Sequence, residues 1–313
     1  MVHIGNPSTV SVILPTYNRA HTVKRAIESV LHQSHADFEL VIVDDGSTDN
    51  TIDVINEITD RRIQILRHKT NRGAGIARNT GIQASQGKYI AFQDSDDEWL
   101  PGILEKQVRV LRQTEQTTDG IGVVYTKFWR RKGDRQIVFP INNSRKLEGD
   151  IHESLLFGNL VTTQTALVKK SCLNELGLFD ENLACLLDWE LWIRISKVYR
   201  FKHISEPLAI VNYSPEGISS HFLALAKANE YILEKHASSF KRSKYAHAQQ
   251  LYLTGNFFYL GGEFHRGKAY LTSARNLSPF NLRYRMVNLI ASLGDNTYMA
   301  AYKLKDRITP YWY

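Results

Sequence analysis

Cysteine is scarce in this chain of 313 residues, which contains only Cys172 and Cys185. Two cysteines cannot build the disulfide framework of a small secreted domain, and no Cys/His cluster has the spacing of a zinc site. We therefore expect a reducing, cytoplasmic setting. Long apolar runs are also missing, since none reaches the roughly 18 to 20 residues that a membrane-spanning helix needs. Residues 1–7 lack the basic and apolar regions of a secretory signal, so we expect no leader.

Acidic residues are scarce only in the C-terminal third. Residues 222–313 contain 13 Lys/Arg and 5 Asp/Glu, whereas residues 1–221 contain 26 and 27, so the net charge of +7 comes from the C-terminal segment. A basic segment on a neutral body favours an anionic partner, for which a membrane surface and nucleic acid are the usual candidates. A solvated helical face explains the same charges, and the sequence leaves both interpretations open.

Strands and helices are predicted to alternate over the first 95 residues. Short β-branched or apolar runs predict strands at 10–14, 38–43, 63–66 and 89–92, and apolar stripes predict helices at 23–31, 52–59 and 75–85. This alternation with short connections indicates a parallel α/β sheet, in which ligands bind beyond the carboxyl ends of the strands. Pro15, Asp44 and Asp94 each follow such an end. We therefore expect a ligand site where these residues meet.

The remaining residues give weaker signals. Pro101 is expected in the first turn of a helix, residues 121–128 alternate like a strand, and residues 130–150 are predicted to be a surface excursion. A helix is expected from about residue 187. Beyond residue 222 the pattern is helical only, and Gly255 to Pro279 is close to one helix–turn–helix unit of the tetratricopeptide type.

Four motifs occur in order in the first 100 residues: Pro15-Thr16-Tyr17-Asn18-Arg19, Val43-Asp44-Asp45-Gly46-Ser47-Thr48-Asp49, Asn71-Arg72-Gly73-Ala74-Gly75-Ile76-Ala77-Arg78-Asn79 and Asp94-Ser95-Asp96-Asp97. In the last, two carboxylates one residue apart suit an oxygen-preferring divalent cation that a diphosphate also holds. The glycines allow close backbone approach to a ligand, and an arginine is suited to phosphate. Asp97 is expected to cap the following helix.

In these motifs the chain resembles the family-2 glycosyltransferases, which have the GT-A fold and invert the sugar of a nucleotide-sugar donor. The resemblance covers roughly residues 8–215. It implies that the donor nucleotide contacts Pro15, Thr16, Tyr17, Asn18, Asp44, Gly73, Arg78, Asp94 and Ser95. It also implies that Asp96, with Asp94, holds Mn²⁺ or Mg²⁺. Read without the resemblance, Tyr17 is an ordinary core aromatic and Asp44 part of a capped turn.

The resemblance further implies that Asp188 is the catalytic base, which takes the proton from the acceptor hydroxyl. Leu187 stands where many relatives have another acidic residue. Glu190 is the nearest substitute, but two residues along a helix it is expected to face away. Trp189 stacks on a sugar or belongs to the core, and Asp188 itself could simply cap the helix.

The chain departs from the family near residue 221. Many relatives have an Arg-x-His before a Gly-Ser-Ile-Ser-like turn, whereas here the expected basic residues are missing and His221 follows the turn. His221 is a candidate for contact with the metal or the diphosphate, and a structural role is its alternative. The departure weakens the prediction of a histidine metal ligand and leaves the donor site unchanged.

The sequence therefore predicts an α/β GT-A domain at 1–221 and a helical extension at 222–313. The donor half is expected at about 8–100 and the acceptor half at 101–221. We expect transfer from a nucleotide-diphosphate sugar, most often UDP-linked, to a saccharide or lipid-linked acceptor in surface polysaccharide, lipopolysaccharide, capsule or glycolipid synthesis.

Three other classes of function are alternatives to this prediction. A dinucleotide-binding fold would need a G-x-G-x-x-G motif after the first strand. A nucleotidyltransferase would need a Gly-rich basic loop at the same place. Pro15-Thr16-Tyr17 occupies that place instead. The third alternative is a catalytically silent protein. It would bind a nucleotide sugar or act as a scaffold through its helical tail.

The basic tail is expected to make a peripheral contact with the anionic inner face of the membrane. The residues expected there are charged or aromatic: Arg283, Arg285, Tyr298, Tyr302, Lys303, Lys305, Arg307, Tyr311, Trp312 and Tyr313. We expect no nucleic-acid partner.

Overall fold

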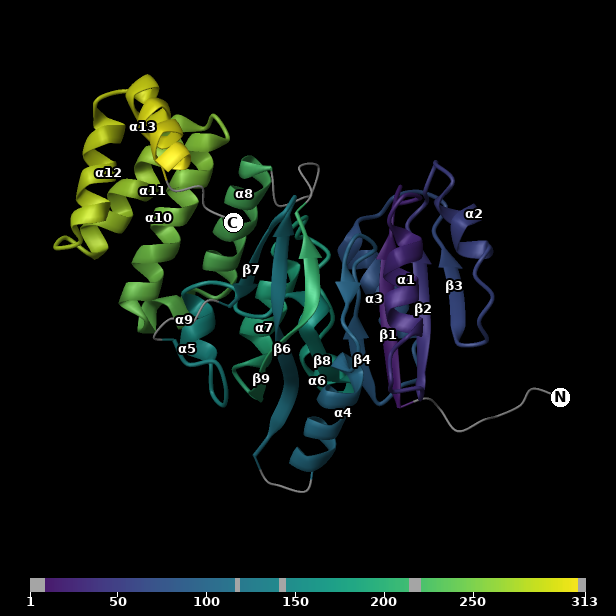
Figure 1. The fold of residues 1–313 in the computed structure, drawn as a ribbon. Coiled ribbons are helices and arrows are strands. Elements are labelled where there is room, and N and C mark those ends of the chain that lie inside the picture. Colours follow the sequence, from purple (N-terminus) through teal and green to yellow (C-terminus); the bar gives the residue numbers. More distant parts are fainter. Residues whose placement is uncertain (1–8, 116–118, 141–144, 214–220, 309–313) are drawn as a thin grey trace. The chain divides into compact units, whose positions relative to one another are not determined.

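A computed structural model describes residues 9–115, 119–140, 145–213 and 221–308. The chain divides into two compact units, one made of residues 1–155 and 159–214 and the other of residues 156–158 and 215–313. Figure 1 shows strands in the first and helices alone in the second. In the described ranges, no helix is both long and apolar enough to cross a membrane.

The first unit is built on one mixed sheet. Its order is β3-β2-β1-β4-β8-β6-β9-β5, with β7 paired to β6. The first four strands along the chain pair in parallel, β8 is antiparallel to both β4 and β6, and β6 and β9 are parallel. The strands are β1 (Val10–Thr16), β2 (Phe38–Asp44), β3 (Ile63–Arg67), β4 (Tyr89–Phe92), β5 (Glu98–Trp99), β6 (Ile121–Lys132), β7 (Arg135–Phe139), β8 (Ala166–Lys169) and β9 (Arg200–Asn212).

Helices pack on both faces of this sheet. Successive side chains of a strand face opposite sides, and Val12 of β1 belongs to the same buried cluster as Ile27 of α1. On the other face, a Cβ on Gly81 of α3 would lie 2.5 Å from Ile13, so α3 crosses β1 closely. The helices of this unit are α1 (Val23–Leu31), α2 (Thr51–Asn56), α3 (Ala74–Ala84), α4 (Ile103–Thr114), α5 (His152–Leu156), α6 (Lys170–Leu176) and α7 (Leu187–Ile195).

One local prediction is wrong and another agrees with the structure. Pro101 precedes α4 and lies outside its first turn, because residues 98–99 instead form β5, which pairs with β9. Residues 130–139 are largely a β-hairpin made by the end of β6 and by β7. Residues 132–136 of this hairpin are exposed, so it agrees with the surface excursion predicted at 130–150.

The second unit consists of helices, as the sequence predicts. They are α8 (Phe222–Lys235), α9 (Ala237–Arg242), α10 (Lys244–Leu260), α11 (Phe264–Leu277), α12 (Leu282–Ser292) and α13 (Asp295–Ile308). Gly255 of α10 and Gly267 of α11 let the two backbones approach, since a Cβ on Gly255 would lie 3.0 Å from the Gly267 carbonyl oxygen. The core of the unit is rich in tyrosine, and Tyr259 stacks on Tyr298 with ring centroids 4.0 Å apart.

Candidate active site

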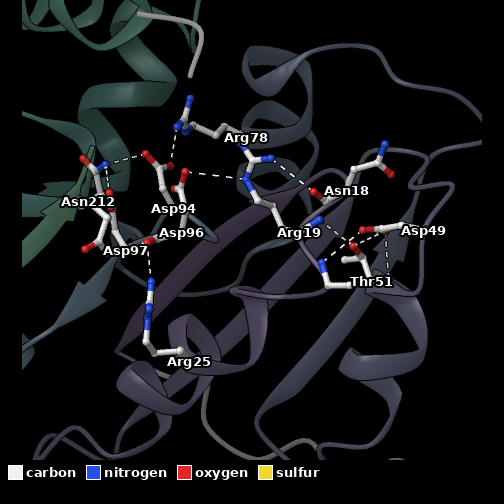
Figure 2. Close-up of polar contacts among 12 residues, drawn as sticks. Asn18, Arg19, Arg25, Asp49, Thr51, Arg78, Asp94, Asp96, Asp97 and Asn212 are labelled. Carbon is white, nitrogen blue, oxygen red and sulfur yellow. Dashed lines mark hydrogen bonds and ion pairs between the residues drawn. The ribbon is translucent and has the colours of Figure 1, made fainter. Parts of the chain in front are cut away.

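An acidic cluster follows the end of β4, the parallel strand that lies between β1 and the antiparallel strand β8. Figure 2 shows Asp94 and Asp96 side by side, facing arginines from two other elements. Arg78 of α3 donates to Asp94 Oδ1 over 2.6 Å, and Gln164 donates to Asp94 Oδ2 over 2.6 Å. Asp96 Oδ2 lies 3.7 Å from Nε of Arg19, in the loop after β1. The carboxyl ends of β1 and β4 thus bring together motifs that are 75 residues apart in the sequence.

Asp97 does not cap a helix, so that prediction is wrong. Its side chain is buried and accepts hydrogen bonds from Gln164 Nε2 at 2.5 Å and from the Asn212 backbone N–H at 2.7 Å. The chain turns into β5 at this point, so no helix begins there. Burial and the charges of Asp96 and Asp94 raise the pKa of Asp97 well above its usual range. Asp97 therefore anchors β9 behind the acidic cluster.

Gln164 and Asn212 were not predicted as site residues, because neither belongs to a motif. Gln164 donates to both Asp94 and Asp97, so one amide group links the two carboxylates. Asn212, at the end of β9, also donates its side-chain amide to the Asp96 carbonyl oxygen at 2.8 Å. The backbone of the D-x-D motif is therefore held from the β9 side, as Figure 2 shows.

The carboxylate oxygens of Asp94 and Asp96 are the ligand type that Mn²⁺ and Mg²⁺ prefer. Burial and the charge of Asp94 raise the pKa of Asp96, and the charges of Arg19 and Arg25 offset this rise only in part. A divalent cation would supply further positive charge. The described residues contain no group of three or more acidic, histidine or cysteine side chains able to hold a metal. Two carboxylates therefore fit a cation only if other ligands, such as a diphosphate, complete its shell.

The loop after β1 lies against the loop after β2. The Asn18 backbone, in the left-handed region at φ 50°, donates its N–H to Ser47 Oγ, and Asn18 Oδ1 accepts from the Thr48 N–H. Asparagine tolerates this conformation better than most residues. Pro15 and Thr16 belong to β1. The structure thus brings together the two motifs predicted to hold the nucleoside.

Tyr17 and Asp44 are placed differently in this region. The Tyr17 side chain is 39% exposed, so it is not the core aromatic of the alternative reading. Asp44 is fully buried; its Oδ1 accepts from the Ser47 N–H, and its Oδ2 lies 3.0 Å from Arg67 Nε. In the described part of the chain, Thr16 Oγ1 and Arg78 Nε are buried without a hydrogen-bond partner. Such unpartnered polar atoms are rare in a finished core and are common where a ligand binds.

Asp45 holds the glycine-rich loop in place, a role that the sequence did not reveal. Its carboxylate accepts from the backbone N–H groups of Arg72 (3.0 Å) and Gly73 (2.8 Å) and contacts His68 Nδ1 at 2.6 Å. Gly73 has φ 95°, in the region that glycine alone adopts readily, and it directly precedes α3. The start of α3, which carries Arg78, is therefore fixed to the end of β2.

Asp188 lies in the first turn of α7. The helix begins after Leu186, so Asp188 is inside the helix and is not its cap. Its Oδ2 accepts from the side-chain amide of Asn159 at 2.7 Å, and its Oδ1 accepts from the Trp189 N–H at 2.9 Å. Burial raises the pKa of Asp188, while these bonds and the charge of Arg78 lower it in part and the charge of Asp94 adds to the rise. Asp188 therefore responds electrostatically to the Arg78–Asp94 pair.

The first turns of α3 and α7 are in contact. A Cβ on Gly75 would lie 3.0 Å from Leu187 Cδ2, so glycine permits this approach. Asn79, one turn further along α3, donates to the Phe179 carbonyl oxygen and accepts from the Phe179 N–H, both at 3.0 Å. Two helix N-termini, each with partial positive charge, therefore meet at the contact between Gly75 and Leu187.

The remaining predicted residues are placed away from this cluster or are buried. Trp189 is in the core, where its indole N–H donates to the Leu155 carbonyl oxygen, so it does not present a face to a sugar. Glu190 is fully buried and paired with Arg194 at 2.9 Å. Ser95 is buried beside Asp94. His221 directly precedes α8 in the second unit and is exposed, so its part in the site stays a prediction.

Comparison with known proteins gives a consistent result. The sequence pattern of "Glycosyl transferase family 2" matches residues 11–173, which is more than half of the chain. A glycosyltransferase of Rickettsia bellii is 35% identical over 203 residues, which are 64% of this chain and 28% of the relative. The UDP-Glc:alpha-D-GlcNAc-diphosphoundecaprenol beta-1,3-glucosyltransferase WfgD of Escherichia coli is 44% identical over 102 residues, 33% of this chain and 40% of WfgD. The chain thus spans well under two thirds of either relative.

Solved structures share the fold. S. aureus TarS 1-349 in complex with UDP-GlcNAc has a TM-score of 0.63 at 20% identity, covering 92% of this chain and 89% of that one. The mannosyltransferase PcManGT from Pyrobaculum calidifontis, in complex with GDP-Man and Mn²⁺, has a TM-score of 0.61 at 18% identity, covering 96% and 87%. The GT-A fold predicted from the sequence is confirmed. The chain belongs to glycosyltransferase family 2.

Proposed function

We propose that this glycosyltransferase moves a sugar from a nucleoside-diphosphate sugar to an acceptor hydroxyl with inversion, using a divalent cation and Asp188 as the base. One observation carries the proposal. The first turn of α7, which carries Asp188, contacts the first turn of α3, the helix of Arg78, yet the side chain that binds Asp188 is the neutral amide of Asn159. A carboxylate held in this way keeps its basicity, whereas one paired with arginine loses it.

The donor diphosphate would bind where α3 and α7 begin. Arg78 offers a buried guanidinium whose Nε has no partner among the described side chains, and the helix N-termini add partial positive charge. The nucleoside would lie along the 15–18 loop, with the exposed ring of Tyr17 against the base and the Asp44 carboxylate near its edge. WfgD takes its sugar from UDP, and TarS has been solved with UDP-GlcNAc. We therefore propose a UDP-linked donor.

Asp96, with Asp94, would hold Mn²⁺ or Mg²⁺ together with the diphosphate. When bound, the cation neutralises charge on the diphosphate as it departs. PcManGT, which shares the fold, was solved with Mn²⁺. The protein keeps Asp96 available for this role, because its closest cation, Arg19 Nε, is 3.7 Å away and therefore makes only a loose pair.

Asp188 would then accept the proton of the acceptor hydroxyl while that oxygen attacks the anomeric carbon. The C–O bond to the acceptor forms as the bond to the diphosphate oxygen breaks, and a single displacement of this kind inverts the sugar. Asn159 keeps one carboxylate oxygen oriented, and the Trp189 N–H holds the other. The raised pKa of Asp188 makes it a better proton acceptor than an exposed aspartate.

The acceptor and the cellular role rest on the relatives. WfgD acts on a diphosphoundecaprenol-linked sugar, and TuaG of Bacillus subtilis is named for teichuronic acid biosynthesis. We propose a step in surface polysaccharide synthesis with a saccharide or lipid-linked acceptor, carried out at an anionic membrane surface. The residues proposed to contact that surface belong to the second unit.

Thermal unfolding with nucleotides tests the donor site. UDP, GDP, dTDP and NAD are each added with and without Mn²⁺ to the full chain. We expect UDP with Mn²⁺ to raise the unfolding temperature, because a ligand at a hundredfold over its Kd adds about 2.7 kcal/mol to the native state. No shift with any nucleoside diphosphate would reject the donor site. NMR of the product anomer then decides between inversion and retention.

A further inference from the structure

Helix α12 of the second unit presents an unusual outward face. Three of its apolar side chains and that of the residue directly after it, each between 61% and 70% exposed, form what we call the α12 ridge: Leu282, Met286, Leu289 and Leu293. At about 100° per residue, positions spaced by four, three and four residues fall in one narrow stripe. The opposite side of the helix is the buried one and includes Tyr284, Asn288 and Ala291.

The ridge therefore lies on a different face of α12 from the one that packs in the core of the unit. Tyr284 stacks on Tyr252 of α10 with centroids 4.9 Å apart, and α12 packs against α11 and α13 at the edge of the unit (Figure 1). A surface helix normally has polar residues opposite its core face. Phe280, just before the helix, is 92% exposed and extends the apolar surface. An exposed stripe of this size on a soluble domain marks a contact surface.

The charged residues of α12 are all positive, and Asp295 follows the helix. Arg283 and Arg285 lie on opposite sides of the ridge, because they are displaced by about 100° and about 60° from Leu282 in opposite directions. Helix α12 contains no carboxylate, and residues 264–303 contain six Lys/Arg and one Asp. Arg283 is oriented by Tyr252, whose ring centroid lies 4.9 Å from its guanidinium carbon. The ridge is thus an apolar strip between two cationic flanks.

We propose that α12 lies in the interface of an anionic lipid bilayer, with the ridge among the acyl chains and the arginines at the head groups. This arrangement is how amphipathic helices bind membrane surfaces. A second copy of the chain fits less well, since two ridges in contact would bring four arginines together without a carboxylate on either helix. Nucleic acid fits less well because it is held by aromatic stacking, and the ridge is aliphatic.

The proposal changes which residues of the tail would contact a membrane. Tyr298, expected there from the sequence, is buried in the core against Tyr259. Side chains beyond Lys303 lie outside those that the structure describes, as do residues 309–313, so Lys305, Arg307, Tyr311, Trp312 and Tyr313 are not placed. Leu289 and Met286, which replace them in the proposal, were not selected from the sequence.

Flotation of the full chain with vesicles tests the proposal, using phosphatidylglycerol mixed with phosphatidylcholine and phosphatidylcholine alone. Leu289→Glu breaks the ridge at a position that is 61% exposed, so we expect the fold to be kept, which circular dichroism checks. Tyr245→Glu is the matched control, because Tyr245 of α10 is 76% exposed in the same unit and the charge change is equal. We expect the wild type and the control to float with anionic vesicles. Leu289→Glu should bind these vesicles with an affinity at least about tenfold lower.

Two further measurements, binding at high salt and binding by an Arg285 variant, test the electrostatic part of the proposal. Raising salt to about 1 M shortens the screening length to about 3 Å, so binding should fall, and Arg285→Gln should weaken it at low salt. The proposal is overturned if the wild type stays unbound with anionic vesicles, if Leu289→Glu floats like the wild type, or if Tyr245→Glu loses binding equally. Light scattering that finds a dimer lost in Leu289→Glu would assign the ridge to a second copy instead. None of these outcomes depends on glycosyl transfer.

Discussion

Two acidic regions of the first unit hold their carboxylates by different means. At the end of β4, Asp94 is paired with the Arg78 guanidinium and Asp96 faces Arg19. At the start of α7, Asp188 is held by the amide of Asn159 and a backbone N–H. The first region is built around full positive charges, and the second around neutral dipoles.

The difference teaches how one site can bind an anion and also remove a proton. The paired carboxylates Asp94 and Asp96 suit a divalent cation, whose charge would offset the burial and the Asp94 charge that raise the pKa of Asp96. Asp188, held by neutral donors, suits the role of base proposed above. Arg78 contributes to both, since its charge also lowers the pKa of Asp188 in part. The two regions can therefore be separated by changing one neighbour at a time.

The largest effect is expected from Asp188→Asn, which removes the base and keeps the shape of the side chain. A general base contributes about 10² to 10⁴ in rate, so kcat should fall about a thousandfold. UDP with Mn²⁺ should still raise the unfolding temperature as it does in the wild type. The matched change Asp53→Asn, at an exposed position of α2, should leave kcat unaltered. A variant of Asp188 with wild-type kcat would remove this residue from the mechanism.

Asp96→Asn should break the other region selectively. Removing one partner of a desolvated charge pair costs about 2 kcal/mol or more, which corresponds to roughly thirtyfold in affinity. We expect this loss in the UDP affinity measured by calorimetry with Mn²⁺, and little change without the metal. Equal weakening in both conditions would mean that Asp96 acts on the nucleotide directly and not through a cation.

The sequence predicted the parts of the site that belong to motifs at strand ends. It could not predict Gln164, because this residue has no motif and reaches the site through sheet topology alone. Strand β8 is antiparallel to β4, with Leu167 opposite Ala91, so the residues that precede β8 lie beside those that follow β4. Asn159 is likewise a single amide in an irregular segment. Such positioning residues are fixed by long-range packing, which local patterns do not encode.

Gln164→Leu should show that the β4 region depends on this amide for stability. Hydrogen bonds to charged groups contribute about 1.5 to 3 kcal/mol, so a change of about 2 kcal/mol should lower the unfolding temperature by about 4 to 8 °C in a unit of this size. Gln107→Leu is the control, because Gln107 is equally buried but donates to the neutral Thr165 carbonyl oxygen at 2.7 Å. If Gln107→Leu lowered the unfolding temperature by the same amount, the bonds of Gln164 to carboxylates would contribute no more than a bond to a neutral carbonyl.

The smallest effect is expected from Asn159→Ala, and it tests the α7 region through pH. The amide hydrogen bond stabilises the ionised form of Asp188 and lowers its pKa, so losing it should raise the pKa further above its usual value. Because the base must be ionised, the acid limb of kcat/KM should move to higher pH, with little loss on the alkaline side. Asn182→Ala is the control, since Asn182 bonds Asp180 at 2.9 Å in the loop before α7 and should leave the limb in place. An acid limb that does not move in Asn159→Ala would show that another group sets it, and the contrast between the two acidic regions would then fail.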